Sequence, residues 1–245
     1  MMRFFQDTFD SQILGCNAYK LFIDDEFLSK EKVENVLREN KMDVLFSFVR
    51  FSDTNISYFE DNHYKLISIR STYKYSNPSQ QKTRMVPDGF LLKTGKQKAD
   101  SIAPSDIIKI AEILGNTSRY FKDKKIPHEK SLQLYATWIQ NSIFNGYADE
   151  SLILMKDNCL AGIHTLKIKN GIGYIDLIGI CHEYQNIGLG KVLLQKGIEW
   201  LQKQNVKQIE VVTEAENIPA TAFYQKNGFV ISNIELIYHK HFSTI

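Results

Sequence analysis

The residues with the clearest chemical potential lie where an apolar segment, residues 175–180, runs into a turn with two glycines. The turn, Gln185-Asn186-Ile187-Gly188-Leu189-Gly190-Lys191, opens a segment with helical periodicity. The start of a helix presents unpaired N–H groups and a positive dipole end, and glycines let the backbone approach a ligand closely. The segment therefore predicts a cradle for a pyrophosphate group.

Two well-known phosphate-binding motifs do not fit this turn. It lacks the G-x-x-x-x-G-K-[ST] pattern of a P-loop, and it lacks the third glycine and downstream acidic residue of a dinucleotide-binding fingerprint. Two glycines by themselves are equally compatible with a glycine-rich turn that binds nothing. The interpretation of the turn therefore depends on the residues that come after it in the chain.

The turn resembles the Q/R-x-x-G-x-G/A motif of the GNAT N-acetyltransferases, and a second motif of that family lies further along the chain. Glu216-Asn217, Ala220, Phe223-Tyr224 and Gly228-Phe229 match its E-N-x-x-A-x-x-F-Y-x-x-x-G-F pattern without a gap. The resemblance covers residues 88–242. It implies a GNAT fold that uses acetyl-CoA as the acetyl donor and needs no metal.

The resemblance also implies roles for individual residues. Backbone groups of Ile178 and Ile180, with Gly179 between them, are expected to hold the pantetheine arm and the thioester carbonyl of acetyl-CoA. Asn217 and Phe223 are expected to border that arm. The pyrophosphate is expected to contact the backbone of the turn, namely Gln185, Asn186, Ile187, Gly188, Leu189, Gly190 and Lys191.

Tyr224 is the implied general acid, which protonates the departing thiolate of CoA. A phenol with a pKa near 10 stays protonated at neutral pH and is well matched to a thiol leaving group with a pKa of about 8.5. The alternative is an aromatic core residue whose hydroxyl group is satisfied within the protein.

The general base is left open by the sequence. Tyr174 and Asp176 lie on the same strand face as Ile178, because side chains alternate along a strand. Asp176 could accept the amine proton through a water, or it could only pair with a neighbouring side chain. His182, in the turn, is expected to be exposed and structural.

More diffuse features resemble the GNAT enzymes that acetylate dTDP-linked amino sugars, the dTDP-fucosamine acetyltransferases of surface-polysaccharide (lipopolysaccharide or O-antigen) synthesis. They are Asp10-Ser11-x-Ile13-Leu14-Gly15, residues 118–121 and residues 134–142. Arg119 and Lys122 could meet a nucleotide diphosphate, and Tyr135 or Trp138 could stack on a sugar or base. Ordinary alternatives are a solvated surface charge for Arg119 and helix packing for the two aromatic residues.

Two other functions remain open. One is a GNAT enzyme that acetylates a protein N-terminus or a small amine, which would leave residues 1–75 without a role. The other is a non-catalytic module that binds acyl-CoA, against which an intact Tyr224 and an intact cradle argue. Turnover of acetyl-CoA with a dTDP-linked amino sugar would separate the three.

Composition excludes several classes of protein. Among 245 residues, 30 basic and 28 acidic residues give a net charge of +2, without the basic stripe of a nucleic-acid binder. Three cysteines without a CxxC spacing argue against a disulfide framework or structural zinc site. No apolar run is long enough to span a membrane, and no signal peptide is evident. A cytoplasmic enzyme is expected.

Periodicity predicts the elements that would position these residues. Alternating strand and helix patterns over residues 1–75 suggest a small N-terminal α/β domain, and residues 76–88 are expected to be a linker. Residues 89–245 are expected to form the GNAT domain, an α/β (α+β) fold with a mixed, mostly antiparallel sheet flanked by helices. No convincing internal repeat is seen. The last strands, over residues 229–242, are expected to form a hairpin through which a homodimer could pair.

Overall fold

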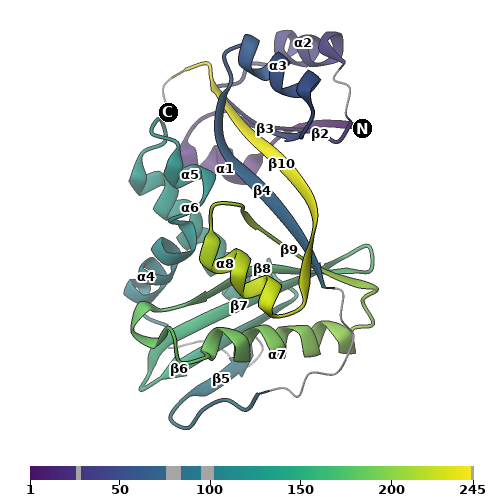
Figure 1. Cartoon of the computed structure of the whole chain (residues 1–245). Coiled ribbons are helices and arrows are strands. Elements are labelled where there is room, and N and C mark those ends of the chain that lie inside the picture. Colours follow the sequence, from purple (N-terminus) through teal and green to yellow (C-terminus); the bar gives the residue numbers. More distant parts are fainter. Residues whose placement is uncertain (26–28, 76–83, 95–101, 244–245) are drawn as a thin grey trace.

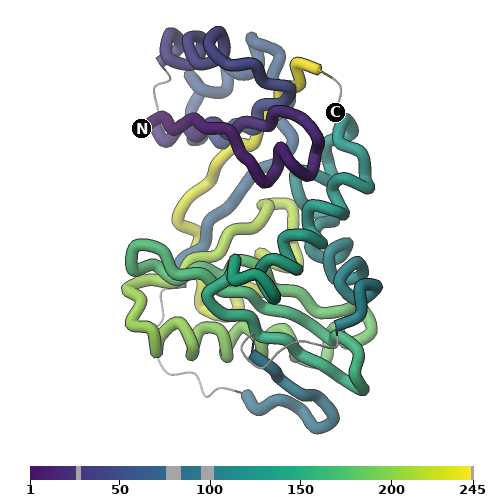
Figure 2. The backbone as a smooth tube through the Cα atoms, turned by 180° about the vertical axis from the view of Figure 1, so that it is seen from behind, coloured from purple at the N-terminus to yellow at the C-terminus, as the bar shows by residue number. Residues whose placement is uncertain are grey.

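The computed structural model describes residues 1–25, 29–75, 84–94 and 102–243, which form one mixed sheet with helices packed around it (Figures 1 and 2). The strand order is β1-β2-β3-β10-β4-β9-β8-β7-β6-β5. The strands are β1 (Met2–Gln6), β2 (Ala18–Ile23), β3 (Val44–Arg50), β4 (Lys65–Tyr75), β5 (Leu91–Thr94), β6 (Glu150–Lys156), β7 (Cys159–Lys169), β8 (Ile172–Ile180), β9 (Gln208–Glu214) and β10 (Phe229–His241).

The helices follow the expected order along the chain. They are α1 (Thr8–Leu14), α2 (Lys30–Glu39), α3 (Asp53–Asp61), α4 (Pro104–Gly115), α5 (Arg119–Lys122), α6 (His128–Phe144), α7 (Leu189–Lys203) and α8 (Ile218–Lys226), with a 3-10 turn at His182–Tyr184. Among the described residues, no helix is both long and apolar enough to cross a membrane.

Most predicted elements are present, and the mixed α/β class is confirmed. The helical spacing of Leu132, Tyr135, Ile139 and Ile143 predicts a helix over residues 128–144, and α6 has those bounds. The predictions missed β1 and α1, whose short segments carry little periodicity. They were wrong about the C-terminal hairpin, since residues 229–241 form one long strand. Most of the predicted linker, residues 76–83, lies outside the described residues.

The structure contains an internal repeat that the sequence pattern does not reveal. In one half, β1 pairs antiparallel with β2, β2 runs parallel to β3, and α2 and α3 follow β2 and β3. In the other half, β7 pairs antiparallel with β8, β8 runs parallel to β9, and α7 and α8 follow β8 and β9. We call these halves the N-terminal and the C-terminal repeat.

The two repeats exchange their last strands. β10 ends the C-terminal repeat but pairs with β3, and β4 ends the N-terminal repeat but pairs with β9. β4 and β10 also pair with each other, and both views show them side by side through the middle of the molecule (Figures 1 and 2). The sheet therefore runs across the predicted boundary at residues 76–88. Residues 235–239 of β10 have both edges paired within the chain, with β3 and β4, whereas residues 229–234 pair with β4 alone. Pairing of a homodimer through this part of the chain stays a prediction.

A buried polar cluster fastens β10 to the connection between α5 and α6. His239 Nδ1 and His241 Nε2 lie 2.7 and 2.6 Å from the same carboxylate oxygen of Asp123, which is almost fully buried. Burial lowers the pKa of His239 to about 4 despite the hydrogen bond to Asp123, so this ring is neutral at pH 7. The cluster fixes the position of α5, which carries Arg119.

β8 and β9 separate part of the way along their length. Their parallel pairing extends from Ile172 opposite Gln208 to Ile175 opposite Val211, after which β8 stays with β7 and β9 stays with β4. At the point of separation, Thr165 and Leu166 of β7 pair with Leu177 and Ile175 of β8, so Asp176 is an extra residue on β8. Such bulges bend a strand and increase its twist. The result is a wedge-shaped gap between two neighbouring strands of the sheet.

Candidate active site

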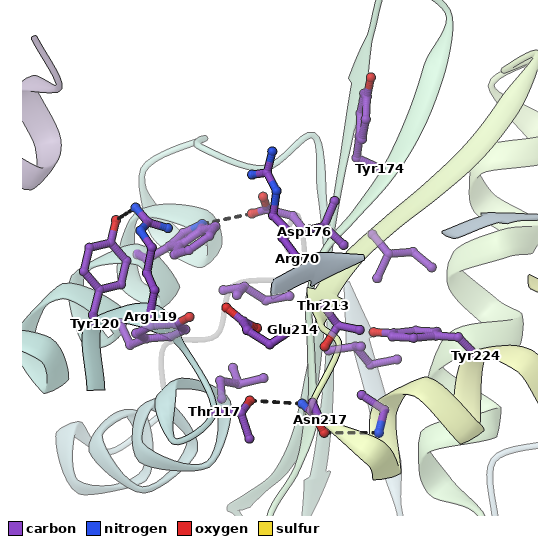
Figure 3. A pocket seen from close by; sticks show the side chains of 18 of the residues that line it. Arg70, Thr117, Arg119, Tyr120, Tyr174, Asp176, Thr213, Glu214, Asn217 and Tyr224 are labelled. Atoms are coloured by element: carbon purple, nitrogen blue, oxygen red, sulfur yellow. Dashed lines mark hydrogen bonds between the residues drawn. The ribbon is translucent and has the colours of Figure 1, made fainter. Parts of the chain in front are cut away.

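A cavity of about 510 Å³ lies at the gap between β8 and β9, and we call it the gap pocket. Tyr174, Asp176 and Ile178 reach it from β8, Glu214 from β9, and Tyr224 from α8 (Figure 3). The helices on the other side add residues of α5 and α6, and β4 adds a cation. Further lining residues include Arg70, Thr117, Arg119, Tyr120, Tyr135, Trp138, Lys167, Lys169 and Asn217.

A second cavity, of about 460 Å³, surrounds the turn that opens α7, and we call it the cradle pocket. Gly188 forms the N-cap of α7 with φ +89°, and Asn186 before it has φ +64°. Glycine adopts this left-handed conformation without the steric cost that a Cβ brings. Lys191 and Lys226 line the cavity, so positive charge accompanies the free N–H groups of the helix start.

The backbone of β8 has the direction that the predicted pantetheine contacts require. The Leu177 N–H donates to Thr165 Oγ1 at 3.1 Å, and the Cys181 N–H donates to the Ala161 carbonyl oxygen at 2.9 Å, both on β7. Backbone groups alternate along a strand, so those of Ile178 and Ile180 point toward the gap. Within the chain, the Ile180 carbonyl oxygen accepts a hydrogen bond from Gln185 Nε2 at 2.9 Å. This bond joins the end of β8 to the turn.

Helix α8 connects the two pockets. Asn217 caps its start, because its Oδ1 accepts from the Ala220 N–H at 3.2 Å while its Nδ2 donates to Thr117 Oγ1 at 3.0 Å. Phe223 lines the cradle pocket, and Tyr224 lines the gap pocket. Successive residues of one short helix therefore serve both cavities.

Tyr224 is buried, with 5% of its surface exposed, and packs against Tyr73 and Phe229. Its ring points into the gap pocket with the hydroxyl directed toward Thr213 (Figure 3). Burial raises the pKa of the Tyr224 phenol well above its ordinary value, because the phenolate would lose its hydration. The hydroxyl group thus keeps its proton at neutral pH, as a general acid must.

Asp176 lies in the gap pocket, where two neighbours contact its carboxylate. Trp138 Nε1 donates to its Oδ2 at 2.9 Å, and Lys167 Nζ lies 3.3 Å from its Oδ1. Burial raises the pKa of Asp176, while Lys167 and the hydrogen bond from Trp138 act in the opposite direction. Both carboxylate oxygens of Asp176 therefore have partners. This agrees with the expectation that Asp176 could only pair with neighbouring side chains.

Glu214, at the end of β9, is a pocket residue that sequence reasoning missed. Burial raises the pKa of its carboxyl group, opposed by the charges of Arg119 and Lys122. Its position at the end of the strand that precedes Glu216-Asn217 was the available signal. Arg70 was missed as well, because it comes from β4 of the other repeat.

The residues predicted to meet the acceptor converge on the gap pocket, although not all are free to bind. Arg119, Tyr135 and Trp138 line it, but Lys122 forms an ion pair with Glu216 outside it. Arg119 is half-buried, with 13% of its side chain exposed, and its guanidinium lies 3.5 Å from the Asp10 carboxylate and contacts the Tyr120 hydroxyl group. His182 is exposed in the 3-10 turn, as expected.

Residues 116–229 match the family described as the acetyltransferase (GNAT) family. Streptothricin acetyltransferase A of Bacillus subtilis (strain 168) is 30% identical over 93 residues, which are 38% of this chain and 54% of that protein. Mycothiol acetyltransferase of Paenarthrobacter aurescens (strain TC1) is 36% identical over 85 residues, 32% of this chain and 26% of that protein. The chain thus spans about half or less of these curated relatives.

Solved structures share the fold over nearly the whole chain. A GCN5-related N-acetyltransferase from Sphaerobacter thermophilus has a TM-score of 0.64 at 11% identity, over 98% of this chain and 76% of that one. A tandem GNAT protein from the clavulanic acid biosynthesis pathway has a TM-score of 0.61 at 12% identity, over 93% and 76%. At these identities the likeness establishes the fold alone.

The two glycines of the turn provide a matched test of the cradle. Gly188→Ala places a Cβ at φ +89° beside the Arg84 guanidinium, whereas a Cβ at Gly190 meets Phe223 at 3.7 Å and Ile180 at 3.8 Å, which are ordinary contacts. We expect Gly188→Ala to raise the Kd for acetyl-CoA about tenfold and Gly190→Ala to change it less than about threefold. Calorimetric titration measures both, with thermal melting as the control for folding. Equal Kd values for the two variants would contradict this placement of the cradle.

Proposed function

We propose that this chain, whose residues 116–229 form an acetyltransferase domain of the GNAT family, transfers an acetyl group from acetyl-CoA to the amine of a small acceptor. The observation that carries the proposal is the pair of cavities to which β8 and α8 both contribute lining residues. The cradle pocket suits the pyrophosphate, and the gap pocket has room for an acceptor. β8 and α8 run from one cavity to the other, which is the path required of an extended pantetheine arm.

Acetyl-CoA supplies the acetyl group as a thioester, whose C–S bond breaks as the amine forms the new C–N bond. Tyr224 donates its proton to the departing sulfur. A carboxylate in the gap pocket accepts the proton that the amine loses. Glu214 is the better candidate for this base, because both oxygens of Asp176 are contacted by Trp138 and Lys167. Asp176 and Glu214 together also favour an acceptor whose amine arrives as a cation.

We propose more specifically that the acceptor is a nucleotide-linked amino sugar, such as a dTDP-linked amino-dideoxy sugar. Four cationic side chains line the gap pocket, and three of them form ion pairs within the chain. Lys169 makes no ion pair with the residues that the structure describes, and its charge favours an acceptor that also carries negative charge. The four are Arg70, Arg119, Lys167 and Lys169. Tyr135 and Trp138 add aromatic surface beside them.

Tyr224→Phe tests the general acid, because the substitution keeps the ring and removes only the hydroxyl group. We expect kcat to fall by about 10²–10⁴-fold while the Kd for acetyl-CoA stays unchanged. Steady-state kinetics and calorimetry measure the two quantities. Tyr75→Phe, at a half-buried tyrosine outside the gap pocket, serves as the control. Wild-type turnover by Tyr224→Phe would mean that another group protonates the thiolate.

The dependence of activity on pH tests the general base. A carboxylate acts as a base only when it is ionised, so kcat/KM should fall as the pH drops through its pKa. Because burial raises the pKa of Glu214, this fall should occur above the ordinary glutamate value of about 4.3. Glu214→Gln should lower kcat strongly and remove the fall, whereas Asp176→Asn should keep it. If Asp176→Asn alone removes the fall, then Asp176 is the base.

A direct comparison of acceptors tests the nucleotide. With a dTDP-linked 4-amino-4,6-dideoxyhexose, kcat/KM should exceed that for the same sugar without its nucleotide by about tenfold or more, because remote binding energy supports the reacting centre. Lys169→Gln should reduce that ratio, and Lys203→Gln, on the outer part of α7, should leave it unchanged. A free amino sugar acetylated equally well would point to a small amine without a nucleotide.

A further inference from the structure

A third cavity, of about 220 Å³, opens between the N-terminal repeat and α6, and we call it the N-terminal lobe. Phe9, Phe22 and Phe48 form its walls from the N-terminal repeat, and Leu134 and Trp138 close it from α6. The ring centroids of Phe22 and Phe48 are 4.6 Å apart with their planes 8° from parallel. Arg3 lies 4.4 Å from the Phe22 centroid and Arg70 4.4 Å from the Phe48 centroid, so the aromatic lining of the lobe is packed together with arginine side chains.

The lobe and the gap pocket share a wall. Arg70, Arg119, Tyr120 and Trp138 line both cavities. Trp138 lines the lobe, and its indole N–H donates a hydrogen bond to Asp176 in the gap pocket. A molecule whose amine lies in the gap pocket could therefore extend past these side chains into the lobe.

The charged groups of the lobe already have partners within the chain. Lys20 Nζ lies 2.5 Å from Asp7 Oδ2 and 3.1 Å from Asp10 Oδ2, and Asp10 also accepts a hydrogen bond from Tyr120 at 2.7 Å. Arg70 pairs with Glu235 at 2.6 Å. A charged ligand group would have to disrupt these largely buried pairs, whereas an uncharged group would not.

One polar atom at the shared wall has no such partner. Among the described residues, Arg119 Nε is buried and makes no hydrogen bond, although the same guanidinium contacts Asp10 and Tyr120. A buried donor without a partner costs free energy unless something satisfies it. An oxygen acceptor on a ligand at this wall would supply the missing bond.

The sequence between β2 and α2 differs from that between β8 and α7. It reads Asp24-Asp25-Glu26-Phe27-Leu28-Ser29, with three acidic residues and no glycine. Acidic side chains repel a pyrophosphate, and glycine is the residue that gives the backbone freedom to approach one. This sequence therefore does not favour a pyrophosphate between β2 and α2.

We propose that the N-terminal lobe is a second acceptor subsite, which binds an uncharged ring with an oxygen acceptor, such as an aryl or sugar ring. The proposal rests on the proposed function, in that it extends the acceptor of the gap pocket. It makes the acceptor a molecule of two parts. Its amine faces Glu214 and Asp176, and its ring lies against Phe22 and Phe48.

Ligand binding in the absence of turnover tests the subsite with the full-length protein. Phenyl β-D-glucopyranoside is the uncharged probe and phenyl phosphate the charged one, and ligand-observed NMR titration gives their Kd values. We expect the glucoside to bind more tightly than the phosphate. Phe22→Ala, and Phe9→Trp which fills the lobe, should each weaken glucoside binding about fivefold or more. Phe4→Ala, on the opposite face of the sheet beside Tyr19, should leave it unchanged.

Two results would overturn the proposal. One is a glucoside Kd that is the same in wild type, Phe9→Trp and Phe4→Ala, and the other is tighter binding of phenyl phosphate than of the glucoside. Phe9→Trp keeps the test valid if Phe22→Ala fails to fold, because it adds volume to an open cavity.

Kinetics with a pair of amines separates this proposal from the proposed function. The phenyl β-glycoside of glucosamine should be acetylated with about tenfold higher kcat/KM than glucosamine, and Phe9→Trp should abolish that advantage. An advantage that survives in Phe9→Trp would count against the subsite. If neither amine is acetylated although acetyl-CoA binds, the proposed function loses support, and the NMR titration still decides the subsite.

Discussion

At the centre of the sheet, β4 and β10 pair with each other, and each also pairs with a strand of the opposite repeat. Every backbone N–H and C=O group buried in a sheet needs a partner, so neither repeat can complete its own half without the other. Removing residues 1–75 would strip β4 from β9 as well as from β10. The gap depends on this exchange, because the end of β9 pairs with β4 after its pairing with β8 has stopped. It also brings Arg70, from the N-terminal repeat, to the wall of a pocket in the C-terminal repeat.

The gap places ionisable groups where water is scarce, and burial then acts in the same direction on each of them. It raises the pKa of Tyr224, Asp176 and Glu214 by disfavouring their charged forms. For the phenol this secures a proton that can be donated. For the carboxylates it increases basicity, which suits a group that must accept a proton from an amine. Cations oppose the effect of burial on the pKa at both carboxylates, Lys167 at Asp176 and Arg119 with Lys122 at Glu214. Asp176 is distinguished by the direct contacts that its oxygens make with Lys167 and Trp138.

The two repeats share a topology but have diverged in their turns and cavities. In the C-terminal repeat, glycines at the start of α7 leave the backbone open to a phosphate. In the N-terminal repeat, the sequence between β2 and α2 is acidic and lacks glycine, and the lobe is lined by aromatic residues and by ion pairs. In the function we propose, the C-terminal repeat binds the acetyl donor and the N-terminal repeat binds part of the acceptor. The buried cluster of Asp123, His239 and His241 supports the shared wall by holding α5 against β10.

The sequence by itself determined the local features. The spacing of Gly188 and Gly190 after an apolar strand indicated the cradle, the motif from Glu216 to Phe229 indicated α8 with Tyr224, and periodicity gave α6 its bounds, because each of these signals is contained within a short stretch of chain. Only the tertiary structure decided which distant residues meet. Arg70 and Phe22 carry no local signature, and Glu214 has only its position before Glu216-Asn217. The exchange of β4 and β10 cannot be read from either strand, since both mix apolar and polar residues and could pair in many registers. Pairing between strands so far apart in sequence is fixed by the packing of the whole sheet, and that packing decides the gap, the shared wall and the N-terminal lobe.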